Sequence, residues 1–171
     1  IPVDEIVRDV VLTAAYAILG RWNEAYDLWD ESRAVALLTT FGVRELADRK
    51  YGTLSEGERK RVQISRALMA DPELLLLDEP VASLDLAARE QTISTIGHYA
   101  QSPYAPAIVM VTHHLEEIPN GFTHAMIVSE GQVFAAGAIE TTLTSEKISE
   151  AFGFEMVVTN EGGRYRARAA H

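Results

Sequence analysis

LLLLDEP, residues 74–80, places four consecutive leucines directly before two carboxylates and a proline. An aliphatic run of this length is typical of a strand buried on both faces, as in a parallel sheet covered by helices. Asp78 and Glu79 then lie at the carboxyl end of that strand, where α/β sheets bind their ligands. Asp78 is suited to hold Mg²⁺ through a water molecule, and Glu79 is suited to polarise a water molecule aimed at a γ-phosphate.

The residues around this strand predict an α/β fold. A helical pattern over 86–100 and a second aliphatic run over 107–112 make strand, helix and strand a βαβ crossover. The other expected elements are helices over 3–20, 31–40, 55–69 and 144–152, short turns over 41–54, a hairpin of 124–129 with 132–135 around Glu130-Gly131, and a strand pair within 156–168. Helices therefore dominate the first part of the chain, and strands dominate the rest.

Composition narrows the class of protein. The chain has 171 residues and a formal net charge of −10, so it is a poor candidate for binding nucleic acid through Lys and Arg contacts to phosphate. It contains no cysteine, which excludes disulfides, thiol catalysis and zinc–thiolate sites. The longest apolar run, the six residues 14–19, is far too short to span a bilayer. Because the chain starts at Ile1 with no initiator Met, we expect it to be a piece of a longer protein.

A second motif opens the helix expected at residue 55. In Leu54-Ser55-Glu56-Gly57-Glu58, Ser55 and Glu58 form a capping-box pattern in which each satisfies a free backbone donor. Such a helix start also offers N–H groups and a positive dipole end to an anion such as phosphate, while Gly57 lets a ligand approach the backbone. Taken alone, the plain capping box is the simpler interpretation.

Two further segments follow at regular structural landmarks. Ser83-Leu84-Asp85 precedes the helix over 86–100, and either Ser83 or Asp85 also suits a simple N-cap. His113 lies just past the second aliphatic strand, from where it can donate a hydrogen bond to a γ-phosphate, and His114 should be structural. Each segment alone has an ordinary structural explanation, but together they stand at matching helix starts and strand ends.

The combination closely resembles the nucleotide-binding domain of ABC transporters over nearly the whole chain. Residues 54–58 resemble its signature motif, 74–80 its Walker B segment with the catalytic glutamate, 83–85 its D-loop, and His113 its switch histidine. The neighbouring segments that also resemble the family are 7–12, 59–62 and 65–68. This resemblance implies a partial P-loop NTPase (RecA-like) core with a mostly parallel sheet over 71–171, and a helical signature subdomain over 1–70.

The resemblance also implies an activity and partners. It implies hydrolysis of ATP with Mg²⁺ at the interface of two such domains, where residues 54–58 serve the ATP of the opposite domain. Asp78, Glu79 and His113 serve the ATP of their own domain. The expected partners are a second ATPase domain and a transmembrane permease, at the cytoplasmic, inner face of the cell membrane. Asp48-Arg49 fits importers of iron complexes and similar cargo.

Two departures from the family pattern modify these expectations. Glu56 and Glu58 replace the usual Gly and Gln of the signature, and a carboxylate near a triphosphate is unfavourable unless it points away. No segment of the sequence matches the P-loop pattern Gly-x-x-x-x-Gly-Lys-[Ser/Thr]. We therefore expect the 171-residue chain alone to be inactive, and we expect it to self-associate through uncovered apolar surface.

Two other functions stay open. The chain could come from a soluble ABC ATPase that has no membrane partner. Alternatively, it could act only as a docking or regulatory module through its aromatic residues, Tyr16, Trp22, Tyr26 and Trp29. A core position for these aromatic residues is the favoured interpretation.

Overall fold

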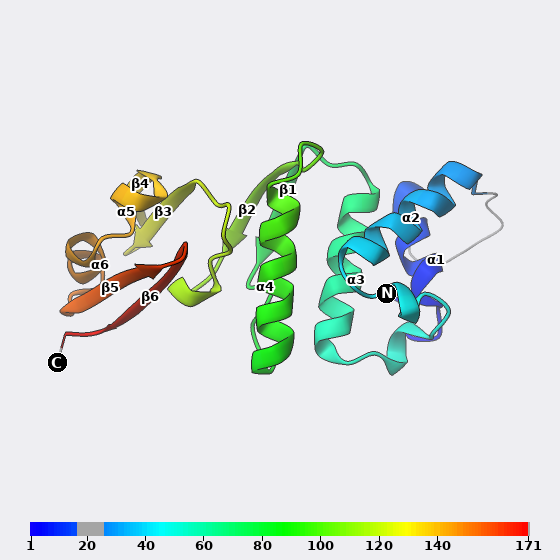
Figure 1. Cartoon of the computed structure of the whole chain (residues 1–171), viewed down its shortest axis with the longest axis horizontal. Coiled ribbons are helices and arrows are strands. Elements are labelled where there is room, and N and C mark those ends of the chain that lie inside the picture. The colour runs from blue at the N-terminus through cyan, green and yellow to red at the C-terminus, as the bar shows by residue number, and fades with distance from the viewer. Residues whose placement is uncertain (17–25, 171) are drawn as a thin grey trace. The chain divides into compact units, whose positions relative to one another are not determined.

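A computed structural model describes residues 1–16 and 26–170 (Figure 1). The chain divides into two compact units, residues 1–111 and 112–171. The predicted boundary between residues 70 and 71 is a division by function inside the first unit, and it stays a prediction. In the described ranges, none of the helices combines the length and apolar character needed to cross a bilayer.

Three helices pack together at the beginning of the first unit. They are α1 (Val7–Leu12), α2 (Leu28–Thr40) and α3 (Glu56–Met69), with 3-10 turns at Thr13–Tyr16, Arg44–Leu46 and Tyr51–Thr53. α3 contacts both other helices, and the side chains between them are fully buried, including Val7, Val11, Leu38, Val62 and Leu68. This apolar contact fixes α3, whose first turn carries the signature-like residues.

The prediction of a helix over 3–20 was wrong at its start. α1 begins at Val7 because the preceding backbone pairs with a later loop: Glu5 O accepts the Tyr51 N–H at 2.8 Å, and Val3 O accepts the Gly52 N–H at 2.8 Å. The α-helix is also shorter than predicted, since α1 ends at Leu12 and the chain continues as a 3-10 turn to Tyr16. The predicted end at Gly20 lies outside the described residues. α2 begins three residues before the predicted Glu31, since the Asp27 side chain caps it.

The predicted βαβ crossover is confirmed. Strand β1 (Leu74–Asp78), helix α4 (Leu86–Ala100) and strand β2 (Ala107–Val111) follow one another, and the two strands pair in parallel from Leu74–Ala107 to Asp78–Val111. Figure 1 shows α4 running alongside this strand pair. The carboxyl ends of β1 and β2 therefore lie side by side.

Burial of β1 on both faces was a wrong prediction. Leu75 and Leu77 are buried, whereas Leu74 is 57% exposed and Leu76 is 64% exposed. Side chains alternate along a strand, and within the described part of this unit only one face of the two-stranded sheet is covered. A continuous leucine run identifies a strand but does not reveal which of its faces is covered.

The second unit is built from two antiparallel hairpins and short helices. Its elements are a 3-10 turn η4 (Leu115–Glu117), β3 (His124–Ser129), β4 (Gln132–Ala138), α5 (Ile139–Thr142), α6 (Ser145–Phe152), β5 (Met156–Glu161) and β6 (Arg164–Ala169). β3 pairs with β4 and β5 with β6, as predicted, but α5 was not expected. Ile127, Leu143, Ile148 and Tyr165 form the core between them.

Candidate functional site

The signature-like segment forms the capping box predicted for it. The Ser55 hydroxyl accepts the Glu58 N–H at 3.3 Å, and the Glu58 carboxylate accepts the Ser55 N–H at 2.7 Å. The bond from the Ser55 N–H holds the pKa of Glu58 below its usual range. The Glu58 carboxylate is thus occupied within the helix cap, while the exposed Glu56 projects to solvent. Both departures from the family signature are compatible with an anion at this helix start.

Gly57 has a packing role that its sequence context did not reveal. It is buried, and a Cβ atom added there would lie 2.8 Å from Cβ of Ala88 and 3.9 Å from Cδ2 of Leu84. The signature turn therefore rests against the D-loop-like segment and the start of α4. No spacing pattern in a single sequence pairs residue 57 with residue 88.

The two acidic residues of LLLLDEP occupy the end of β1. Asp78 is its last residue and is exposed, and Glu79 is half-buried with a left-handed φ of 43°. The Glu79 N–H donates to Val111 O at 3.0 Å, so the turn is tied to the end of β2. An exposed carboxylate at a strand end, with room for water, fits the coordination that Mg²⁺ prefers. No cluster of three metal-binding side chains occurs within residues 1–16 and 26–170.

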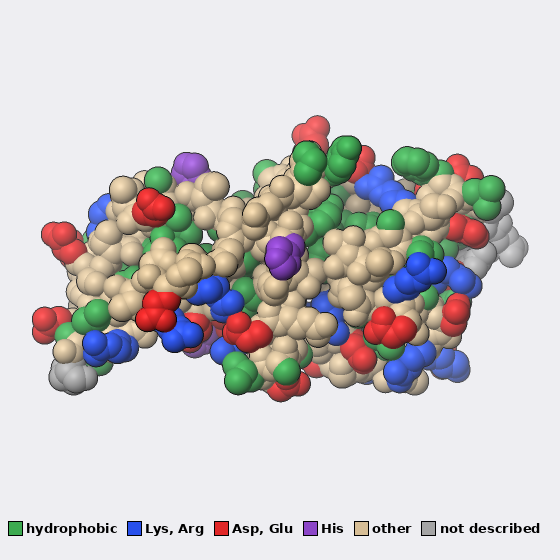
Figure 2. All heavy atoms as spheres, viewed as in Figure 1, with side chains coloured by type: hydrophobic (Ala, Val, Ile, Leu, Met, Phe, Trp, Pro, Cys, Tyr) green, Lys and Arg blue, Asp and Glu red, His purple; other side chains and the backbone are tan. Residues whose placement is uncertain are grey.

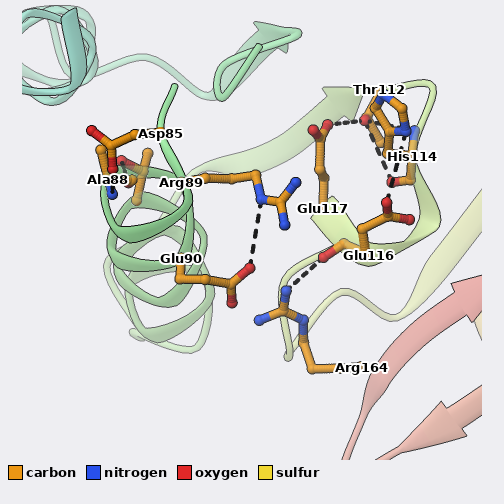
Figure 3. A network of polar contacts seen from close by, with 10 residues as sticks. Asp85, Ala88, Arg89, Glu90, Thr112, His114, Glu116, Glu117 and Arg164 are labelled. Atoms are coloured by element: carbon orange, nitrogen blue, oxygen red, sulfur yellow. Dashed lines mark hydrogen bonds and ion pairs between the residues drawn. The ribbon is translucent and has the colours of Figure 1, made fainter. Parts of the chain in front are cut away.

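The D-loop-like segment leads directly into α4. Ser83 is left-handed, with φ 64°, and Asp85 caps the helix by accepting the Ala88 N–H at 2.9 Å (Figure 3). The simple N-cap interpretation thus holds for Asp85 and not for Ser83. The first unit brings together the signature turn and this segment, with the β1 carboxylates a few residues upstream.

His113 belongs to the second unit and follows the end of β2 by two residues; its side chain is exposed. On either side of it, Thr112 donates to Glu117 and accepts the His114 N–H at 3.1 Å (Figure 3). Glu117 is 5% exposed and was not singled out from the sequence. Its only signal was its place four residues after the histidine. His114 lies 3.8 Å from Glu116, consistent with the structural role expected for it.

The core position favoured for the aromatic residues was wrong for two of them. Tyr16 is 53% exposed and Trp29 is 73% exposed, because Trp29 lies with the exposed Leu28 at the start of α2. The Tyr16 and Tyr26 rings pack 5.6 Å apart, and Trp22 lies outside the described residues. Figure 2 shows hydrophobic side chains protruding near the start of α2 and acidic and basic side chains interspersed on this face.

Comparison with known proteins identifies relatives that are ABC transporter ATP-binding proteins, the family that the motifs resemble. The family model for ABC transporters matches residues 5–82. The ABC transporter ATP-binding protein YlmA of Bacillus subtilis is 43% identical over 162 residues, which cover 94% of this chain and 61% of YlmA. The molybdenum import ATP-binding protein ModC of Brucella abortus is 45% identical over 129 residues, covering 72% of this chain and 35% of ModC.

A solved structure shows the same fold. The structure of cbiO1 from Clostridium perfringens, part of the transporter complex cbiONQ, has a TM-score of 0.69 and 23% identity, and the match covers 87% of this chain and 57% of that one. This chain thus spans about three-fifths of the length of YlmA and of cbiO1. On the motif geometry, the family model and these relatives, the chain belongs to the family of ABC transporter ATP-binding proteins.

Proposed function

We propose that the chain supplies the signature, Walker B, D-loop and switch-histidine segments of an ATP-hydrolysing subunit that powers an ABC transporter. The observation that carries this proposal is the signature turn. Ser55 caps an exposed helix start while the Glu58 carboxylate is withdrawn into the capping box, so the positive helix end stays open to a phosphate.

Each site residue then has a defined role. Ser55 and the N–H groups after it bind the γ-phosphate of ATP held by a second ATPase domain. Asp78 would hold Mg²⁺ through water, and the ion would supply positive charge to the phosphates. Glu79 orients and polarises the attacking water, and His113 donates a hydrogen bond to the γ-phosphate.

The role of Glu79 is tested in the ATPase subunit assembled with its permease. E79Q keeps the size of the side chain and removes its basicity, so we expect ATP hydrolysis to fall at least about 100-fold while ATP still binds. E73Q is the matched control, since Glu73 is exposed just before β1. Hydrolysis by E79Q at the rate of E73Q would show that Glu79 is not the catalytic base.

The 171-residue chain alone should not bind ATP tightly. Its sequence has no P-loop, and hence no nest of N–H groups and no lysine for the β- and γ-phosphates. Calorimetric titration with Mg-ATP should show no saturable binding below the millimolar range. Binding in the micromolar range would mean that other residues of the chain hold the phosphates without a P-loop.

We further propose import as the direction of transport, on the basis of the similarity to ModC, which is named a molybdenum import protein. Iron complexes, which Asp48-Arg49 suggests, are the proposed cargo class. In the structure Asp48 forms an ion pair of 3.2 Å with Arg8. The test measures uptake of labelled ferric chelate and of labelled molybdate in cells with and without the subunit. Loss of ferric chelate uptake alone would support iron complexes as the cargo, whereas loss of molybdate uptake alone would contradict it.

The exposed aromatic residues support a docking surface for the permease. Leu28 and Trp29 are 82% and 73% exposed side by side at the start of α2, which suits contact with an apolar loop. W29A should therefore reduce co-purification of the subunit with its permease at the inner face of the membrane. The control T40A, at an exposed position at the other end of α2, should not. A subunit that never co-purifies with a membrane protein would favour the soluble ABC ATPase instead.

A further inference from the structure

The backbone on both sides of His113 is held by one side chain. The Thr112 hydroxyl donates to the Glu117 carboxylate and accepts the His114 N–H at 3.1 Å, so it closes the turn that contains His113 (Figure 3). Glu117 is 5% exposed, and a buried carboxylate is costly unless it is hydrogen-bonded. The Thr112–Glu117 bond is therefore a defined structural feature and not a chance surface contact.

The C-terminal hairpin holds the same segment from a second side. Arg164, the first residue of β6, donates from Nη2 to the Glu116 carbonyl at 2.5 Å (Figure 3). Four residues further along, Asn120 donates to Gly162 O at 3.2 Å, and a Cβ atom added to Gly163 would lie 2.8 Å from Asn120 Oδ1. The hairpin turn thus fits closely against the segment that follows the switch histidine.

The apolar core completes this support. Leu115 and Ile118, which flank the two glutamates of η4, pack against the core cluster that includes Tyr165 of β6. The segment 112–120 is consequently fixed by the Thr112–Glu117 pair, by Arg164 and by apolar packing, while the His113 side chain itself stays exposed. An exposed side chain has a defined direction only if its backbone is fixed.

We propose that Thr112, Glu117 and Arg164 are positioning residues that together form a brace for His113, with Arg164 acting from the β5–β6 hairpin. This inference rests on the proposed role of His113 in ATP hydrolysis. A donor that is misaligned for part of the time lowers the rate of the chemical step, and it does so with a smaller effect on ATP binding, to which His113 contributes only one hydrogen bond.

Three pairs of variants in the ATPase subunit assembled with its permease test the brace. Each pair compares a substitution in the brace with the same substitution at a control position: T112V with T159V, R164Q with R166Q, and G163A with G162A. Thr159 and Arg166 are exposed on the same hairpin. Gly162 and Gly163 both have positive φ, but a Cβ on Gly162 would meet nothing within 4 Å. The controls therefore reproduce the change in chemistry without touching the brace.

The expected result is a separation of kcat from KM. T112V and R164Q should lower kcat about tenfold and leave KM for ATP within about twofold, whereas T159V and R166Q should leave both unchanged. T112S keeps the hydroxyl and should restore kcat, which a loss of general stability would not do. G163A should show a smaller drop than R164Q, because Asn120 can move aside.

Amide hydrogen exchange measures the brace without any assay of activity. T112V should accelerate exchange of the His114 amide at least about tenfold relative to T159V. Unchanged exchange would show that no brace exists. Faster exchange with unchanged kcat, in a subunit that H113A inactivates, would overturn the positioning role while leaving the proposed function intact. A wild-type subunit without ATP hydrolysis would instead refute the proposed function, and the positioning role with it.

Discussion

Replacing Gly57 by Ala tests the contact between the signature turn and α4. The added Cβ atom would lie 2.8 Å from Cβ of Ala88, well inside ordinary van der Waals contact, and both atoms are attached directly to helix backbone. Since neither can rotate away, α3 or α4 must shift, and overpacking of this kind costs about 1–3 kcal/mol. Alanine in a helix gains up to about 1 kcal/mol over glycine, so the net loss in free energy of unfolding should be about 1–2 kcal/mol.

A double-mutant cycle with Ala88→Gly separates this clash from any other effect. A88G removes the methyl group that Cβ of residue 57 would meet, so G57A in the A88G background should be neutral or stabilising. Urea unfolding of the four proteins, followed by far-UV circular dichroism, should give a coupling of about 1–2 kcal/mol. An equal loss from G57A in both backgrounds would refute a direct contact between these two positions.

Three other variants test the signature turn, the face of β1 and a buried arginine. The Ser55 N–H lowers the pKa of Glu58 in the folded chain. The stability that this bond adds is therefore present at neutral pH and is lost as the pH falls from about 4.5 through the lower pKa of the folded state. E58Q should flatten this part of the dependence of the free energy of unfolding on pH. The uncovered face of β1 should make the chain self-associate, and L76K, unlike E73K, should shift light scattering toward the monomer; a wild-type monomer at all concentrations would contradict this. Arg61 is 7% exposed, and its Nε and Nη1 atoms have no hydrogen-bond partner among the described residues. R61M should therefore leave the free energy of unfolding unchanged or raise it by about 1 kcal/mol. A loss above about 2 kcal/mol in urea unfolding would contradict this expectation.

Local signals in the sequence were sufficient for elements whose ends are set by nearby residues. Ser55 and Glu58 predict the start of α3 because the capping box involves only residues three apart. Glu130-Gly131 predicts the β3–β4 hairpin because both residues adopt the left-handed conformation that such a turn requires. The start of α1 could not be predicted in this way, since it depends on pairing of Glu5 with Tyr51, far along the chain.

The same distinction between local signals and distant contacts applies to the candidate site. Asp78, Asp85 and Ser55 could be identified because each lies at a strand end or a helix start that is visible in the sequence. Arg164 and Glu117 could not, because their importance comes from a tertiary contact and from burial. A single sequence reveals the residue types that suit phosphate chemistry, but not the residues that hold them in place.

The conformation of Glu79 shows how local strain and site geometry are connected. Side chains alternate along β1, so a strand continued past Asp78 would place residue 79 on the same face as the buried Leu75 and Leu77. The left-handed φ of 43° ends the strand at this point and leaves Glu79 half-buried at its carboxyl end. A non-glycine residue in this conformation costs about 1–3 kcal/mol, which a glycine here would avoid. The bond from the Glu79 N–H to Val111 O helps to offset that cost, so the turn keeps a carboxylate where backbone preference alone favours glycine.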